Sequence, residues 1–307
     1  MGLASRINGL TKSRTWEEQF LDAMNQAIKE QNKPRPSKPN IKPSKTACLR
    51  MMYYILTDAP VDSKDSVSPD MSLIQKDGSD THETIQDILA GAKPFGINYL
   101  DQRTELKLVA ERGLDTYVTD SPSNKKGGHE IHCYNPTYGI SFMFDGVIEF
   151  LEKKVIFELK TEDHFKYQKR FAPDPGHIEQ ATFYSACLGL EWVLFLYVNR
   201  NYRWRKPFLI HITEEMRREA LNRVKIARYC ATHNIVPCKE EGKCTYCQYK
   251  RTCKGHGNVT HVGQVDMAEV AATPWEDLVT YHYGREVIEE PTTEENKEGA
   301  NYVTETT

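Results

Sequence analysis

The sequence lacks any apolar segment long enough to cross a membrane. Its longest uninterrupted apolar run, Trp192 to Val198, falls far short of the ~20 residues that a membrane helix needs. The first residues lack the apolar core of a secretory signal peptide, and no Walker A pattern marks a nucleotide-binding loop. These absences predict a cytoplasmic protein with no membrane partner and no ATP-driven motor of its own.

Disulfide bonds are not expected in a cytoplasmic chain, yet the sequence holds 8 cysteines. In a reducing compartment, so many cysteines indicate metal or redox chemistry for some of them. Cys133, Cys187 and Cys230 fit ordinary packing positions. The net charge is −3, but acidic residues concentrate after His261, so the preceding body is basic. A basic body is typical of proteins that bind polyanions.

The expected elements follow the order of a mixed sheet flanked by helices. Hydrophobic spacing predicts helices, with an interruption at Gly78, over residues 15–31, 46–56, 72–91, 96–113, 177–190 and 214–233. β-Branched and aromatic residues predict strands at 140–150, 154–161, 191–199 and 207–213. The first two strands are predicted to form a hairpin across Leu151–Lys153. The expected fold class is α/β (α+β).

Composition divides the chain into three parts. Residues 1–43 hold a predicted helix and a Pro- and Lys-rich linker, and residues 44–257 form the predicted core domain. Residues 258–307 form an acidic tail that we expect to be largely disordered. We place the functional residues in the middle part.

Two carboxylates and a lysine are expected to meet on the predicted hairpin. Asp145 lies in its first strand, and Glu158, Leu159 and Lys160 follow one another in its second. Residues two apart in a strand share a face, so Glu158 and Lys160 lie together. Paired carboxylates, with the backbone carbonyl of Leu159, suit Mg²⁺ or Mn²⁺, which activates water for phosphodiester hydrolysis. The alternative is a surface ion pair, but charge inside an otherwise apolar strand is costly.

In this pattern the chain resembles the PD-(D/E)xK nucleases and, within them, the RecB-type family. That family carries a helix histidine, an aspartate, an ExK and a helix with QxxxY, which appear here as His82, Asp145, Glu158 with Lys160, and Gln180 with Tyr184. The aspartate stands in FDG rather than PD. The resemblance implies a restriction-endonuclease-like sheet, with His82 as a further metal ligand. It also implies that Gln180 and Tyr184 support the lysine or contact DNA.

A second group of residues extends the resemblance to the iron–sulfur subgroup of that family. Cys244, Cys247 and Cys253 form C-x2-C-x5-C, and Cys48 lies far upstream. AddB-like nuclease domains and CRISPR adaptation exonucleases have one such cysteine before the nuclease core and three after it. The resemblance implies a 4Fe–4S cluster that staples a helical region. The alternative is Zn²⁺ bound by the three clustered cysteines and His256, with Cys238 nearby.

These residues together predict a metal-dependent DNA exonuclease acting in recombination, repair or replication, for instance in a phage. Its partners are single-stranded DNA or duplex ends, with a helicase, recombinase or single-strand-binding protein as a possible companion. Four residues of a basic aromatic segment are expected to stack on or guide a strand, namely Tyr202, Arg203, Trp204 and Arg205. The alternative for this segment is an exposed loop at the edge of a strand. The alternatives are a structure-specific endonuclease and a non-catalytic DNA-binding subunit with a metal-stapled fold.

Overall fold

Helices and strands make up most of the part of the chain that the structure describes. The computed structural model describes residues 15–31, 38–62, 68–121, 124, 131–240, 244, 247–256 and 265–285. Its α-helices are α1 (Trp16–Gln31), α2 (Leu49–Leu56), α3 (Pro69–Ala90), α4 (Gln102–Glu111), α5 (His164–Gln168), α6 (Pro175–Leu188), α7 (Glu214–Thr232), α8 (Lys250–His256) and α9 (Met267–Ala272). Its strands are β1 (Asn98–Leu100), β2 (Tyr117–Val118), β3 (Cys133–Asn135), β4 (Ile140–Phe142), β5 (Gly146–Phe150), β6 (Lys153–Glu162), β7 (Trp192–Asn199) and β8 (Arg205–His211). No helix among these residues is long and apolar enough to span a membrane.

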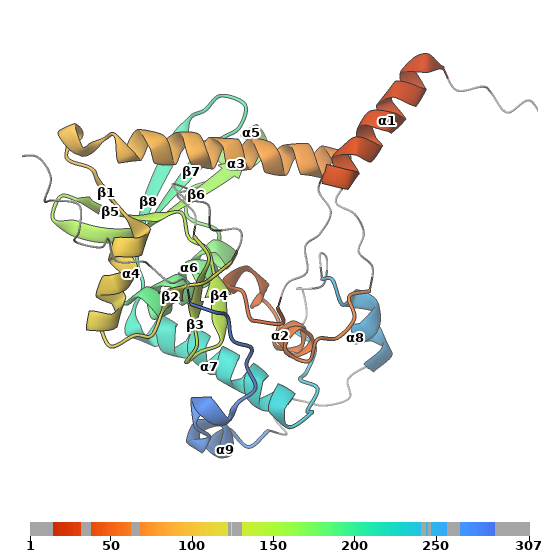
Figure 1. Cartoon of the computed structure of the whole chain (residues 1–307), viewed down its shortest axis with the longest axis vertical. Helices are drawn as coiled ribbons and strands as arrows, with labels where there is room; N and C mark the ends of the chain where they lie inside the picture. Colours follow the sequence, from red (N-terminus) through yellow and green to blue (C-terminus); the bar gives the residue numbers. More distant parts are fainter. Residues whose placement is uncertain are drawn as a thin grey trace, which may run out of the picture.

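A five-stranded sheet lies at the centre of the molecule, in the order β1-β5-β6-β7-β8. Neighbouring strands are antiparallel except β6 and β7, which are parallel. A parallel pair needs a crossover, and the segment with α5 and α6 provides it. α3 crosses one face of the sheet, and α6 covers the other with α7 beneath it (Figure 1). The fold is the expected mixed α+β sheet flanked by helices, consistent with a restriction-endonuclease-like class.

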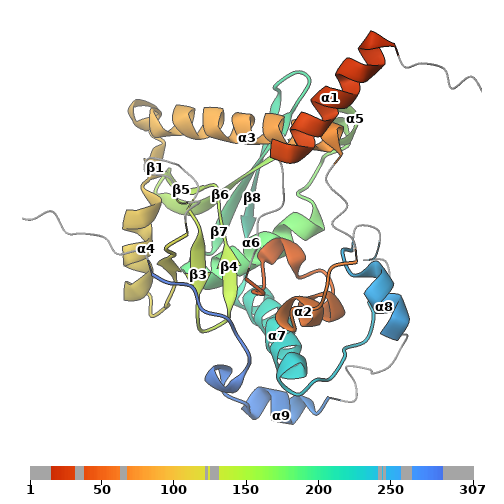
Figure 2. The ribbon, with the colours of Figure 1, turned by 45° about the vertical axis from the view of Figure 1, so that its right-hand side comes forward.

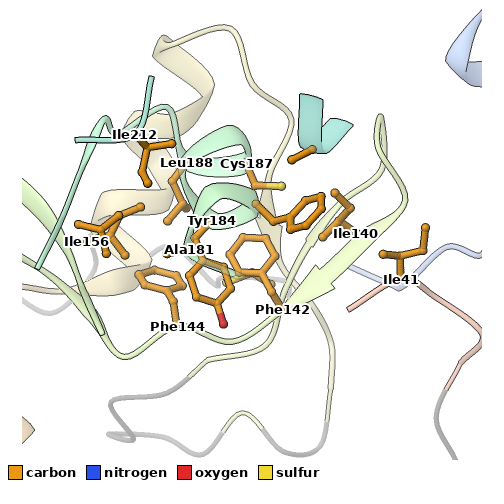
Figure 3. Close-up of a cluster of buried hydrophobic side chains, with 14 of the residues drawn as sticks. Ile41, Ile140, Phe142, Phe144, Ile156, Ala181, Tyr184, Cys187, Leu188 and Ile212 are labelled. Carbon is orange, nitrogen blue, oxygen red and sulfur yellow. The ribbon is translucent and has the colours of Figure 1, made fainter. Parts of the chain in front are cut away.

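Apolar side chains hold helices against both faces of the sheet. On the α3 side, Ile85 and Leu89 pack near Phe157 of β6. On the α6 side, Ile156 and Tyr184 belong to the main core, and Figure 3 shows them with the rings and aliphatic chains around them. A strand covered on both faces is expected to be apolar on both. The charged residues within β6 are therefore exceptions that require partners.

The prediction of one strand over residues 140–150 is wrong, because two strands of different sheets occupy that range. β4 belongs to a three-stranded sheet with β2 and β3, and β5 belongs to the central sheet. Between them Phe144 is buried in the main core, and Asp145 points its carboxylate at β6. Asp145 therefore lies in the link before β5 rather than inside a strand. The predicted hairpin of β5 and β6 is confirmed, with Phe150 paired to Lys153.

The predicted interruption at Gly78 is also wrong, because α3 runs through it without a break. Ser68 caps the helix through the Met71 N–H, and Pro69 occupies its first position. The predicted helix over residues 96–113 is confirmed only from Gln102 onward, where Asp101 caps α4. Before it, β1 pairs with β5 at the edge of the sheet. The helices predicted around α1, α2, α6 and α7 are confirmed within a few residues at their ends.

The two ends of the described chain behave differently. α1 leans against one end of α3 (Figure 2), and the apolar Trp16 and Phe20 are 72% and 56% exposed. Residues 265–285 of the expected acidic tail lie against the core instead, where Val270 and Leu278 are buried beside α7. The remainder of that tail, and residues 1–14 of the N-terminal part, lie outside the described residues.

Candidate active site and cysteine cavity

The carboxylate of Asp145 is held between β6 and α3. β5 begins only at Gly146, and the Asp145 Oδ2 atom accepts the Leu159 N–H of β6 at 2.6 Å. Its Oδ1 atom lies 3.1 Å from His82 Nδ1 on α3. The N–H and C=O of one strand residue point to the same side, so the Leu159 carbonyl faces Asp145 as well. Three predicted site residues, His82, Asp145 and Leu159, therefore meet at one point.

Glu158 and Lys160 share the opposite face of β6 from Leu159, as predicted. Lys160 Nζ lies 2.5 Å from Glu158 Oε1, and the Glu158 residue is 3% exposed. Burial raises the pKa of Glu158 to about 7, with Asp145 adding to the rise and Lys160 opposing it. Burial opposes the charge of Lys160 too, but the neighbouring Glu158 and Asp145 raise its pKa overall. The lysine is therefore the charged partner at neutral pH.

Gln180 and Tyr184 support the lysine from α6. Lys160 Nζ donates to Gln180 Oε1 at 3.3 Å, and Gln180 Nε2 donates to the Tyr184 hydroxyl at 2.5 Å. Tyr184 is buried, and its ring lies 5.4 Å from that of Phe142 (Figure 3). Of the two predicted roles, this geometry favours support of Lys160 over contact with DNA for Tyr184.

The donor set fits a divalent cation, although protein groups satisfy much of it here. Glu158 Oε2 is buried and has no hydrogen-bond partner among the described residues. A buried carboxylate oxygen without a partner is costly, and a cation between Glu158 and Asp145 removes that cost. Among the described residues, no group of three or more His, Cys, Asp or Glu is already arranged around a metal position.

Four cysteines line one cavity between α2 and α8, about 310 Å³ in volume. They are the four predicted ligands, Cys48, Cys244, Cys247 and Cys253. Neither Cys238 nor His256 is among the described residues that line it, and His256 Nδ1 lies 2.8 Å from the Tyr54 hydroxyl. Arg50 donates to Cys253 Sγ at 3.5 Å, and Lys239, Lys250 and Lys254 border the cavity. Cations around four thiols suit a group that binds them as thiolates.

Comparisons with known proteins give distant similarity only. Neither a family model nor a curated protein matches the sequence. Among solved structures, that of SSO0001 is similar at a TM-score of 0.44 and 12% identity, covering 78% of this chain and 98% of that chain. An alkaline exonuclease from Laribacter hongkongensis, LHK-Exo, is similar at a TM-score of 0.32 and 14% identity, and its complex with dAMP at 0.35 and 13%. Both cover 70% of this chain and 94% of the exonuclease. We therefore infer the function from the residues of the site.

The predicted DNA-contacting segment lies at the β7–β8 turn. The rings of Tyr202 and Trp204 stack at 4.8 Å, and His164 lies edge-on to both. Arg203 is engaged within the protein, since it donates to Thr81 Oγ1 at 2.8 Å and pairs with Asp77. The aromatic pair is half exposed and offers a flat apolar surface to a base, whereas Arg203 anchors the turn to α3.

Several residues that order this site gave no sequence signal. Gln86 Nε2 and the Tyr99 hydroxyl both donate to the Asp145 carbonyl, at 2.7 and 2.6 Å. On the other face, the Tyr197 hydroxyl lies 2.8 Å from His177 Nδ1 next to Lys160. Burial, with Lys160 adding to it, lowers the pKa of His177 to about 4, so this histidine is neutral. Gln86 lies one helical turn after His82, but an i,i+4 spacing alone does not mark a site residue.

Proposed function

We propose that this protein is a metal-dependent DNA nuclease, and specifically an exonuclease. The observation that carries the proposal is Glu158, a buried carboxylate with an unpartnered oxygen beside Asp145 and Lys160. Burial of a carboxylate oxygen without a partner costs free energy, and a bound cation offsets that cost. The basic body of the chain and the exposed aromatic pair, Tyr202 and Trp204, support a nucleic acid as the substrate.

Each side chain has a distinct task in this proposal. Asp145 and Glu158 hold Mg²⁺ or Mn²⁺, with His82 and the Leu159 carbonyl as further ligands. The bound metal supplies a Lewis acid and lowers the pKa of its water. Lys160 stays charged, orients the attacking water and stabilises negative charge that develops on the phosphorus oxygens. Gln180 accepts a hydrogen bond from the Lys160 ammonium and is itself held by the Tyr184 hydroxyl. The two residues thereby keep the ammonium in position beside Glu158.

The test is hydrolysis of DNA labelled at the 5′ or 3′ end, single- or double-stranded, with Mg²⁺ or Mn²⁺. We expect metal-dependent release of short products. Glu158→Gln and Lys160→Met should each lower the rate by at least about a hundredfold. Glu215→Gln is the matched control, because Glu215 is an exposed residue on α7, and it should keep the wild-type rate. Absence of hydrolysis with either metal contradicts the proposal.

The same assay separates the exonuclease from its two rivals. Cutting of closed circular DNA identifies a structure-specific endonuclease, since an exonuclease needs an end. Tight DNA binding without hydrolysis identifies a non-catalytic DNA-binding subunit. We place the exonuclease at DNA ends that arise in recombination, repair or replication, beside a helicase, recombinase or single-strand-binding protein.

We also propose that the cysteine cavity holds a 4Fe–4S cluster bound by Cys48, Cys244, Cys247 and Cys253. Cys48 lines the cavity, and His256 is not among the described residues that do, which favours four thiolates over the zinc alternative. Burial raises the pKa of the Cys247 thiol, so binding of the group must displace its proton. A cluster there ties α2 to the segment around α8, which lies about 200 residues later in the sequence.

Element analysis of anaerobically purified protein tests this assignment. We expect about four iron and four sulfide per chain, and loss of both in Cys247→Ser. Cys187→Ser is the control, because Cys187 is a buried cysteine of α6 that is not among the residues lining the cavity, and it should keep the iron. One zinc per chain, with neither iron nor sulfide, contradicts the cluster.

A further inference from the structure

A second cavity adjoins the candidate active site on the α3 side of the sheet. Its volume is about 480 Å³, and its polar or small lining residues are Gln75, Gly78, Ser79, His82, Thr161 and Arg200. His82 borders both sites, because its Nδ1 atom also lies 3.1 Å from Asp145 Oδ1. We call this space the α3 cavity. A group bound in it lies one side chain away from the proposed metal position.

The chemistry of the α3 cavity is that of an anion site. None of the described residues that line it is Asp or Glu, whereas Gln75, Thr161 and Arg200 carry N–H or O–H donors. The Ser79 hydroxyl donates within α3 instead, to the Gln75 carbonyl at 3.2 Å. Arg200 brings a permanent positive charge with a planar donor fork, which suits phosphate. Asp163, whose pKa Arg200 helps to lower, is engaged elsewhere, since it caps α5 through the Lys166 N–H.

The cavity is built from rigid elements rather than from a loose surface. Gln75, Gly78, Ser79 and His82 recur at helical spacing, so one face of α3 presents them all. Thr161 belongs to β6 and lies on the opposite face from Lys160. Arg200 follows β7 directly. Its backbone N–H donates to the Glu162 carbonyl at 2.9 Å, which extends the parallel pairing of β6 and β7 by one residue. The backbone positions that carry the donors are therefore fixed before any ligand arrives.

Gly78 supplies a further reason to regard the cavity as functional. A glycine in the middle of a helix as long as α3 is destabilising relative to alanine. A Cβ atom at this position would lie 3.5 Å from Thr161 Oγ1, an ordinary contact distance. Close packing therefore does not require the glycine. A side chain longer than a methyl group at this position would extend past Thr161 into the α3 cavity, so the glycine keeps the cavity open.

We propose that the α3 cavity binds a phosphate group of the DNA strand, adjacent to the phosphate that is hydrolysed at Asp145 and Glu158. This inference rests on the proposed nuclease function and adds a subsite to it. Arg200 is the main anchor, and Gln75 and Thr161 supply neutral hydrogen bonds. A fixed phosphate beside the reacting one sets the register of the strand, as phosphate contacts do in other protein–DNA complexes.

The test is equilibrium binding of a labelled single-stranded oligonucleotide by the full chain in EDTA, where metal-dependent hydrolysis does not interfere. Arg200→Gln should weaken binding roughly tenfold at low salt. The slope of log K against log salt should become shallower by about 0.7, the value for one lost phosphate contact on a single strand. Arg218→Gln, an exposed arginine on α7, is the matched control and should leave both quantities unchanged.

Gly78→Leu is a second variant, which blocks the cavity with a side chain and removes no charge. Leucine favours a helix more than glycine does, so we expect a melting temperature no lower than that of the wild type. Its side chain should fill the α3 cavity and weaken binding by a similar factor. Oligonucleotides with and without a terminal phosphate, and a circular one, distinguish a terminal phosphate from an internal one.

Wild-type affinity and slope in Arg200→Gln, or wild-type affinity in Gly78→Leu, overturn the phosphate site. These results leave the nuclease proposal intact if the wild type hydrolyses DNA. Conversely, the wild type could hydrolyse no DNA while Arg200→Gln still has the shallower salt slope. That result contradicts the nuclease proposal and supports the phosphate site. The two failures are therefore distinguishable.

Discussion

At the scale of single residues, Glu158 makes a prediction about pH. Its pKa in the folded state is raised from 4.5 to about 7, chiefly by burial. Between these values the folded protein binds more protons than the unfolded chain, so the metal-free protein loses stability as pH rises from about 4.5 to about 7. Glu158→Gln is neutral throughout and should lack this loss. The measurement is the free energy of unfolding in EDTA from pH 5 to pH 8.

We expect the free energy of unfolding of the wild type, relative to that of Glu158→Gln, to fall as pH rises. Lys160 loses its partner in Glu158→Gln, which lowers the absolute stability but not the predicted trend. Parallel pH profiles would contradict a perturbed Glu158. Added Mg²⁺ at pH 8 should raise the melting temperature of the wild type by mass action and leave that of the variant nearly unchanged.

Some residues of the candidate site could be predicted from the sequence, and others could not. Asp145, Glu158 and Lys160 were predictable, because their spacing places them on a hairpin and their charge is exceptional within an apolar strand. Gln86 and Tyr99, which fix the Asp145 carbonyl, were not predictable. Their roles depend on how β1 pairs with β5 and on the path of α3 across the sheet. No local pattern encodes contacts over such separations.

At the scale of elements, the turn between β5 and β6 contains strain that a double substitution should remove. Leu151 and Glu152 both have positive φ, 48° and 62°, where a side chain is unfavourable. A two-residue hairpin turn of this kind prefers Asn-Gly. Leu151→Asn with Glu152→Gly should stabilise the protein by about 1 kcal/mol, measured by chemical denaturation. Leu151 is 80% exposed, so little packing is lost.

A suitable control for this turn is Leu209→Asn on β8, because Leu209 is also an exposed leucine but lies in a strand. It should not stabilise the protein. Equal gains from both changes would mean that removal of an exposed apolar side chain, rather than turn geometry, is responsible. The nuclease rate should be unaffected by the turn variant, since the turn lies at the far end of β6 from Lys160.

Element boundaries were predicted best where one hydrophobic period runs unbroken, as in α7, and worst where tertiary contacts decide. Residues 140–150 have one continuous apolar pattern, but the chain leaves one sheet and enters another at Phe144 and Asp145. Gly78 predicts a break in a helix, because glycine has a low helix propensity. Contacts of α3 with the sheet override that propensity. Both errors lie at the candidate site, where the chain departs from its local preferences.

At the scale of the whole molecule, residues 265–285 close the core around a buried arginine. Arg228 of α7 is 1% exposed, and burial lowers its pKa to about 10. Its guanidinium donates to the carbonyls of Trp275, Leu278 and Val279, at 2.7 to 3.0 Å, and to that of Thr137 at 2.9 Å. The acidic composition of residues 258–307 as a whole predicts a tail, because it averages this stretch, where apolar residues are frequent, with the strongly acidic residues that follow it.

Shortening the chain to end at Gln264 removes three of the four carbonyls and leaves the Arg228 charge buried. We expect the free energy of unfolding to fall by about 3–5 kcal/mol, as for other broken buried charge contacts. Arg228→Met should be destabilising in the full chain, because the carbonyls lose their donor. In the shortened chain the same substitution should be stabilising, because it removes an unpaired charge. A change of the same sign in both chains, measured by chemical denaturation, would show that residues 265–285 act through apolar packing instead of through Arg228.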